Sequence, residues 1–131
     1  PTFTGTAEAA MQAVNHGYEF VYGHVAAPDE CGHRAEAENK VRSVELIDRK
    51  ILKPVYEYLA HCNDDFKILV LPDHPTPVEL RTHTSDPVPF MAYSSQRQVK
   101  GVDTFNETTA AATGLYIPDG YNLLDFLFNE V

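Results

Sequence analysis

Apolar positions between Arg34 and His61 recur every three or four residues, which is the spacing that places side chains on one face of a helix. The stripe comprises Val41, Val44, Ile47, Ile51, Val55, Tyr58 and Cys62. Pro54 lies inside this pattern. Because proline lacks the backbone N–H and clashes with the preceding turn, we expect the helix to kink or divide at Lys53.

Three shorter apolar runs predict strands. Tyr18–Val25 and Phe66–Leu71 are rich in aromatic and β-branched residues, as buried strands are. Val88–Tyr93 is a third candidate, and Pro89 favours an edge position or a strand start there. The proline-rich segment 72–77 is expected to be a loop.

Three further segments carry helix signals. Ala7–His16 is rich in helix-forming residues and Gly17 suits the position just past its end. The segment 106–113 begins at a capping asparagine and stops at Gly114, and a last helix is expected over Asp119–Asn129. This order predicts an α/β fold, with parallel strands joined by a right-handed crossover helix.

The charge and composition of the chain exclude some classes of binding partner. The 131 residues include 19 Asp and Glu against 10 Lys and Arg, a formal charge of −9. Such a surface repels phosphate backbones and anionic lipids, so we expect neither nucleic acid nor a membrane as partner. Residues 1–5 lack the features of a signal peptide, and the two cysteines form no disulfide framework. These features predict a cytoplasmic protein.

Histidines and aspartates gather where the predicted strands end. Asp29 and His33 follow the first strand, Asp73 and His74 follow the second, and His83 comes nine residues later. Ligands of open α/β sheets bind at the carboxyl ends of strands, so these side chains can converge. Mixed imidazole and carboxylate ligands suit zinc, manganese or cobalt, and magnesium where carboxylates dominate. Five such groups favour two adjacent ions over one.

Each group also has a simpler interpretation. A single aspartate or histidine in a loop is more often a solvated or hydrogen-bonded surface group than a metal ligand. Asp73 and His74 lie between prolines, where an aspartate commonly accepts backbone hydrogen bonds in a turn. Arg81 can contact an anion or form an ion pair within its loop.

Three motifs in order connect these groups to a known family. They are His24–His33 (HVAAPDECGH), Leu69–Pro77 (LVLPDHPTP) and Arg81–Thr84 (RTHT) followed by Asp86–Phe90 (DPVPF). Together they resemble the archaeal-type cofactor-independent (2,3-bisphosphoglycerate-independent) phosphoglycerate mutases of the alkaline phosphatase superfamily. The resemblance extends over essentially the whole chain. It implies the C-terminal half of an alkaline-phosphatase-like fold, so residues 1–131 would be the C-terminal part of the metal-binding domain, without the N-terminal part and the substrate-capping domain.

The resemblance also implies a reaction and its ligands. One divalent ion would be held by Asp29, His33 and His83, and a second by Asp73 and His74 with an Asp and a nucleophilic Ser outside this chain. Manganese is the expected metal. The activity would be that of a glycolytic isomerase, which interconverts 3-phosphoglycerate and 2-phosphoglycerate through a phosphoserine. The isolated piece, lacking the nucleophile, is expected to be inactive.

Two other functions fit the same residues. One is a related phosphotransferase of the superfamily, such as a homoserine kinase-like enzyme or a phosphatase. The other is a non-catalytic metal-binding domain. In each case, the surfaces of this chain that would pack against strands outside it are left exposed, and these surfaces are apolar. We therefore also expect the chain to self-associate.

The position of His83 makes a geometric prediction. If His83 joins Asp29 and His33, only four residues separate it from the strand that begins at Val88. Four residues span at most ~14 Å, which is shorter than a strand of six or seven residues. The third strand must then start at the metal end and run antiparallel to the others.

Overall fold

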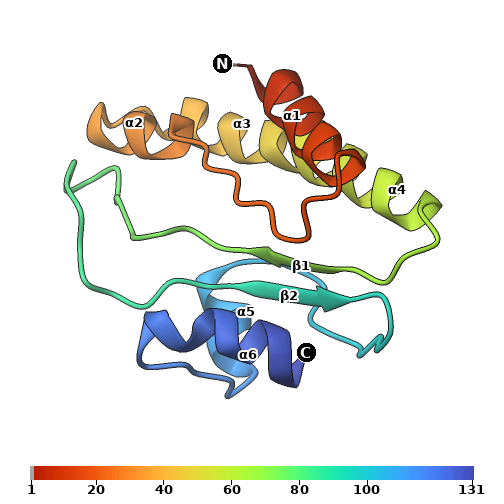
Figure 1. Ribbon diagram of the computed structural model, residues 1–131. Helices are drawn as coiled ribbons and strands as arrows, with labels where there is room; N and C mark the ends of the chain where they lie inside the picture. The colour runs from red at the N-terminus through yellow and green to blue at the C-terminus, as the bar shows by residue number, and fades with distance from the viewer. Residues whose placement is uncertain (1) are drawn as a thin grey trace. The chain divides into compact units, whose positions relative to one another are not determined.

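The computed structural model describes residues 2–131, which separate into two compact units. The first unit comprises residues 2–63 and Thr76–Thr84, and the second comprises Asp64–Pro75 and Ser85–Val131. The first is helical and the second contains the sheet (Figure 1). No helix in the described part of the chain combines the length and apolar character needed to cross a membrane.

The first unit opens with helix α1 (Phe3–Asn15), which begins four residues before the predicted start. The side chain of Thr2 accepts a hydrogen bond from the backbone N–H of Gly5 and so caps the helix. Gly17 follows the helix with φ of 92°, a left-handed conformation that glycine adopts at low cost. Ala7 is the buried residue of α1.

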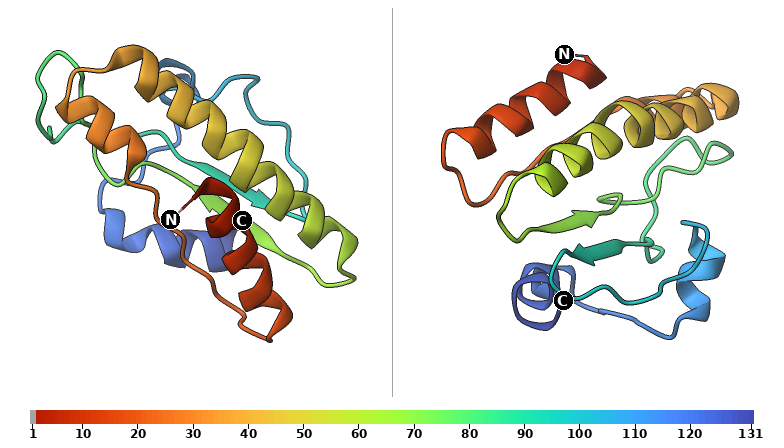
Figure 2. Two further views of the ribbon diagram at one scale, coloured as in Figure 1. Left: turned by 90° about the horizontal axis from the view of Figure 1, so that it is seen from above. Right: turned by 90° about the vertical axis from the view of Figure 1, so that its right-hand side faces the viewer.

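The predicted long helix is present as one rod with a local change of winding (Figure 2, left). It comprises α3 (Ala37–Ile47), a π-helical turn η1 (Asp48–Leu52) and α4 (Lys53–His61). The π-helical turn ends directly before Lys53, where the sequence predicts a kink or a division. The wider turn accommodates the missing N–H and the bulk of Pro54 while the rod continues. Helix α1 packs against η1 and α4.

The apolar stripe of this rod is buried unevenly. Val41 and Val44 are 60% and 50% exposed, whereas the members of the stripe from Ile47 onward are half-buried. The first turns of α3 instead direct Ser43, which is 6% exposed, toward the interior. Its hydroxyl donates to the carbonyl oxygen of Lys40 and is therefore satisfied.

The predicted strand over Tyr18–Val25 is wrong. This segment is irregular and has no ladder partner among residues 2–131. Tyr18, Phe20 and Tyr22 are 67%, 53% and 75% exposed, so the expected burial is absent as well. The predicted parallel strands and their crossover consequently do not occur in the described chain. An apolar run favours a strand, but a strand also requires a hydrogen-bonded neighbour.

The second unit is built on two antiparallel strands, β1 (Lys67–Val70) and β2 (Met91–Ser94). Lys67 is paired with Ser94 and Val70 with Met91. β1 lies within the predicted run, whereas β2 begins three residues later than predicted. Their antiparallel pairing agrees with the orientation expected from His83. Pro89 lies two residues before β2, outside the ladder, where its missing N–H costs the ladder nothing.

Three short helical segments complete this unit: α5 (Glu107–Ala112), η2 (Gly120–Asn122) and α6 (Leu123–Glu130). Asn106 caps α5 as predicted, its side chain accepting from the N–H of Thr109. Leu123 and Leu127 of α6 are 8% and 5% exposed and form the core. Phe90 and Phe126 add an edge-to-face ring contact at 5.9 Å.

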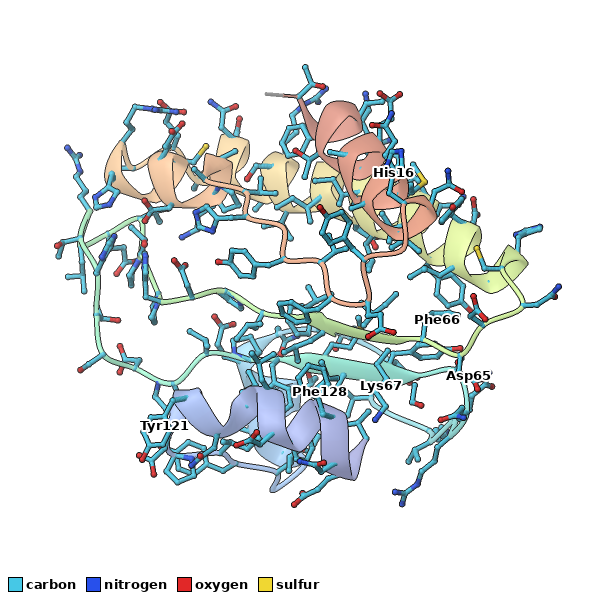
Figure 3. The ribbon with its side chains drawn as sticks, in the orientation of Figure 1. His16, Asp65, Phe66, Lys67, Tyr121 and Phe128 are labelled. Carbon is cyan, nitrogen blue, oxygen red and sulfur yellow. The ribbon has the colours of Figure 1, made fainter. Side chains whose placement is uncertain are left out.

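A lysine joins the sheet to the end of α6 (Figure 3). The Nζ of Lys67 donates to the carbonyl oxygens of Leu127 and Phe128 at 2.9 and 3.1 Å. These carbonyls lie in the last turn of the helix, where they have no helical partner and where a positive charge is favourable. The bond anchors α6 to β1.

Candidate metal centre

Helix α2 (Ala27–His33) presents Asp29 and His33 on one face, four residues apart. The Oδ1 of Asp29 lies 3.3 Å from the Nε2 of His33. The sequence pattern predicts no helix at these residues. Pro28 lies in the first turn, where a helix needs no N–H donor, so it starts this helix instead of interrupting it.

The end of α2 is fixed by two backbone hydrogen bonds. The N–H of Ala35 donates to the carbonyl of Gly32 at 3.1 Å, and that of Glu36 donates to the carbonyl of Cys31 at 2.9 Å. This is the Schellman arrangement, with Ala35 in the left-handed region at φ of 56°. The motif ends the helix directly after His33.

His83 reaches the same place from a loop of the first unit. The loop turns at Pro77, whose carbonyl accepts from the N–H of Arg81 at 2.9 Å. Arg81 has φ of 55°, and its carbonyl oxygen lies 3.0 Å from the Nδ1 of His33. Because a carbonyl only accepts, Nδ1 of His33 carries the proton and Nε2 presents its lone pair to the site.

The three side chains that the resemblance assigns to one ion come together at this point. The Nε2 of His83 lies 3.1 Å from the Oδ1 of Asp29 and 3.1 Å from the Nε2 of His33. Ligand atoms bound to one ion at ~2.0–2.1 Å are roughly 3.0–3.4 Å apart, so the spacing fits a divalent cation. Two facing ring nitrogens also need a proton or a cation between them.

The composition and exposure of the cluster fit a reactive metal site. One carboxylate and two imidazoles suit zinc, manganese or cobalt. Three protein ligands leave positions open for water or substrate, as catalytic sites do. The side chains of Asp29, His33 and His83 are 35%, 42% and 50% exposed, so an ion and a small ligand can reach them from solvent.

Thr76 is a site residue that the sequence analysis does not identify. Its hydroxyl donates to the Oδ1 of Asp29 at 2.6 Å. This bond holds the pKa of the Asp29 carboxyl below its usual range, and the neighbouring His33 and His83 lower it further against the opposing effect of partial burial. The only signal for Thr76 is its place in the loop after Asp73 and His74, since a single hydroxyl has no periodicity.

The other predicted site residues are Asp73, His74 and Arg81. Asp73 and His74 belong to the second unit, in the loop after β1. The Oδ1 of Asp73 accepts from the N–H of His74 at 3.1 Å, which is the turn chemistry weighed above, and its Oδ2 lies 3.4 Å from the Nε2 of His74. Arg81 lies in the His83 loop, and its guanidinium forms no ion pair within residues 2–131.

Comparisons with known proteins agree with this chemistry. The profile of the metalloenzyme superfamily matches residues 2–129. The chain is 38% identical over 125 residues to the 2,3-bisphosphoglycerate-independent phosphoglycerate mutase of Methanothrix thermoacetophila, covering 95% of this chain and 32% of that protein. It is 36% identical over 129 residues to the enzyme of the same name from Methanosarcina mazei, covering 98% and 32%.

A solved structure shares the fold. The PH0037 protein from Pyrococcus horikoshii superposes with a TM-score of 0.72 and 26% identity, over 85% of this chain and 32% of that one. The chain thus spans about a third of the length of the relatives it matches. Since the superfamily profile covers nearly every residue, including the three that meet at the candidate centre, this chain belongs to the metalloenzyme superfamily.

Proposed function

We propose that this chain supplies metal-binding residues of a cofactor-independent phosphoglycerate mutase, which interconverts 3-phosphoglycerate and 2-phosphoglycerate in glycolysis. The observation that carries the proposal is the triangle of Asp29, His33 and His83. It lies in a chain that is similar over 95% and 98% of its length to phosphoglycerate mutases. The activity as a whole would belong to a longer polypeptide, as in those relatives.

Asp29, His33 and His83 would hold one ion, with manganese as the expected metal and zinc, cobalt and magnesium as the alternatives. Asp73 and His74 would contribute to a second ion together with residues outside this sequence. When bound, the ions would activate an attacking hydroxyl and stabilise the charge on the phosphoryl oxygens. Asp29 supplies the negative charge that attracts the first ion, and the carbonyl of Arg81 keeps His33 in the tautomer that binds it.

The nucleophilic serine would come from outside this sequence. Three serines of this chain already have structural partners: Ser43 donates to Lys40, Ser94 accepts from the N–H of Gln96, and Ser95 accepts from the N–H of Phe66. None of these three is in the metal cluster. Because the resemblance places the nucleophilic serine outside this sequence, we expect the chain by itself to show no mutase turnover.

Arg81 would bind the anionic substrate. Its guanidinium is exposed and lies two residues from His83, so a phosphate or carboxylate at the metal could receive a bidentate hydrogen bond from it. An acidic protein of charge −9 repels anions at long range. Bound cations together with Arg81 would reverse this locally.

A chimera tests the proposal. The matching third of the Methanothrix thermoacetophila enzyme is replaced by residues 2–129 of this chain, and conversion of 3-phosphoglycerate is measured with Mn²⁺. We expect conversion by the chimera, and none by the same chimera carrying His83→Ala or by this chain alone. A chimera that folds and binds Mn²⁺ but does not isomerise phosphoglycerate would refute the proposal. Release of inorganic phosphate instead would favour a phosphatase.

Two further expectations accompany this function. We propose a cytoplasmic location, supported by the free thiols of Cys31 and Cys62. We also propose that the chain self-associates, because Tyr18, Tyr22 and Tyr121 are 67%, 75% and 81% exposed. Light scattering over a range of protein concentrations would test the second, and a constant monomer mass would contradict it.

A further inference from the structure

The Asp29 oxygen that faces the candidate centre also accepts a hydrogen bond from Thr76, which is not itself a candidate metal ligand. The hydroxyl of Thr76 donates to the same Oδ1 of Asp29 that faces His33 and His83. A carboxylate oxygen has two lone pairs, so one can accept from Thr76 while the other is directed to the ligand cluster. A bond of 2.6 Å between these groups restricts rotation of the carboxylate.

Thr76 itself is held from two sides. It is only 4% exposed, although Asp29 and His83 beside it are partly open to solvent. On one side its backbone lies against Gly32 of α2, so closely that a Cβ at residue 32 would collide with the Thr76 carbonyl oxygen. On the other side the Nζ of Lys40, from α3, donates to that carbonyl at 2.5 Å.

These contacts connect the loop to both helices at the site. Gly32 lies between Asp29 and His33 in sequence and allows the loop to approach α2, while Lys40 attaches the same peptide to α3. The hydroxyl of Thr76 is thereby fixed at the carboxylate before any ion arrives. Hydrogen bonds of this kind orient metal ligands, and their loss typically weakens metal binding by about 10–100-fold.

We propose that Thr76 is a positioning residue of the candidate centre, which orients the Asp29 carboxylate for a divalent cation and is itself held by Gly32 and Lys40. Thr76 does not touch the ion. The inference rests on the proposed metal site. It assigns to Thr76 an effect on the metal affinity of that site.

The test uses Mn²⁺ as the probe and isothermal titration as the readout, with the thermal midpoint of the metal-free chain measured in parallel. Thr76→Val keeps the shape of the side chain and removes the hydroxyl, and we expect about 10–100-fold weaker Mn²⁺ binding. Thr76→Ser keeps the hydroxyl and is expected to bind within about threefold of the parent chain. Lys40→Met should also weaken Mn²⁺ binding, by a smaller factor than Thr76→Val.

The comparison separates positioning from folding. A purely structural role would move the thermal midpoint in Thr76→Val and leave the affinity of the folded variant unchanged, which would overturn the inference. If Thr76→Val does not fold, Thr76→Ala removes the same hydroxyl with less steric demand and is read in the same way. If the parent chain itself fails to bind Mn²⁺, the proposed metal site is wrong. If His83→Ala loses Mn²⁺ while Thr76→Val does not, only the role of Thr76 is wrong.

Discussion

The Nδ1 of His33 lies 3.0 Å from the carbonyl oxygen of Arg81, across 48 residues of sequence. The contact depends on the backbone of Arg81, whose φ of 55° turns the peptide toward α2. Non-glycine residues seldom adopt this conformation, since it costs about 1–2 kcal/mol. The tautomer of His33 and the course of the His83 loop are therefore set by one peptide group.

This contact predicts different effects of two substitutions at Arg81. Arg81→Gly tolerates the same φ and should bind Mn²⁺ within about twofold of the parent chain. Arg81→Pro forces φ near −65° and removes the N–H that donates to Pro77, so binding should weaken about tenfold or more. Titration calorimetry measures both. Equal losses in the two variants would mean that the guanidinium, and not the backbone, supports the metal.

Metal binding should weaken as the pH falls. The imidazoles of His33 and His83 must be unprotonated to bind, so protons compete with the ion for both rings. The lowered pKa of Asp29 keeps that carboxylate ionised at every pH above the usual range of an aspartate. Binding of each ion should therefore displace up to about two protons, and the apparent Mn²⁺ affinity should fall accordingly as the pH falls. A pH-independent affinity would contradict the assignment of the histidines.

Asp29 also makes the stability of the metal-free chain depend on pH. A carboxyl whose pKa is lowered in the folded state stabilises the fold above the unfolded-state value near 3.8, and this contribution disappears as the pH falls through the lower folded-state value. Since the Thr76 hydroxyl is the main cause of the lowering, Thr76→Val should show a smaller loss of stability on acidification below that value. Urea unfolding at several pH values compares the two chains, and identical profiles would be the contrary result.

Leu127 and Leu124 form a matched pair on α6. Leu127 is 5% exposed and Leu124 is 43% exposed. Leu127→Ala should lower the free energy of unfolding by about 2–5 kcal/mol through lost burial and an unfilled cavity. Leu124→Ala should cost about 0.5 kcal/mol or less. Urea denaturation distinguishes the two, and equal costs would contradict the described core.

Substituting glycine for Ala35 and for Ala9 should change the free energy of unfolding in opposite directions. Ala35 closes α2 in the left-handed region, so Ala35→Gly should raise the free energy of unfolding by about 0.5–1 kcal/mol. Ala9 is an exposed residue within α1, and Ala9→Gly should lower it by about 0.5–1 kcal/mol. Loss of stability in both variants would show that Ala35 is not strained.

The sequence predicts much of the fold because several segments carry their own signals. Periodicity identifies the long helix, and Pro54 marks the place where its winding changes. The failures have physical causes. The run Tyr18–Val25 has strand composition but no partner in the described chain, and helix α2 begins with a proline that looks like a break unless its position in the first turn is known.

For the residues with metal-binding side chains, the sequence predicts their proximity, and their binding of a metal stays a prediction. Asp29, His33 and His83 meet as the resemblance implies. Thr76 and the carbonyl of Arg81 were not predictable, because their roles depend on loop conformation and on close packing at Gly32, neither of which has a sequence period.

The most direct test of the account is calorimetric titration of the metal-free chain with Mn²⁺, repeated for Asp29→Ala, His83→Ala and the control His24→Ala. His24 is an exposed histidine outside the cluster. We expect the parent chain and His24→Ala to bind Mn²⁺ alike, and Asp29→Ala and His83→Ala to bind it at least about tenfold more weakly. Undiminished binding by both Asp29→Ala and His83→Ala, or no binding by the parent chain, would contradict the metal centre.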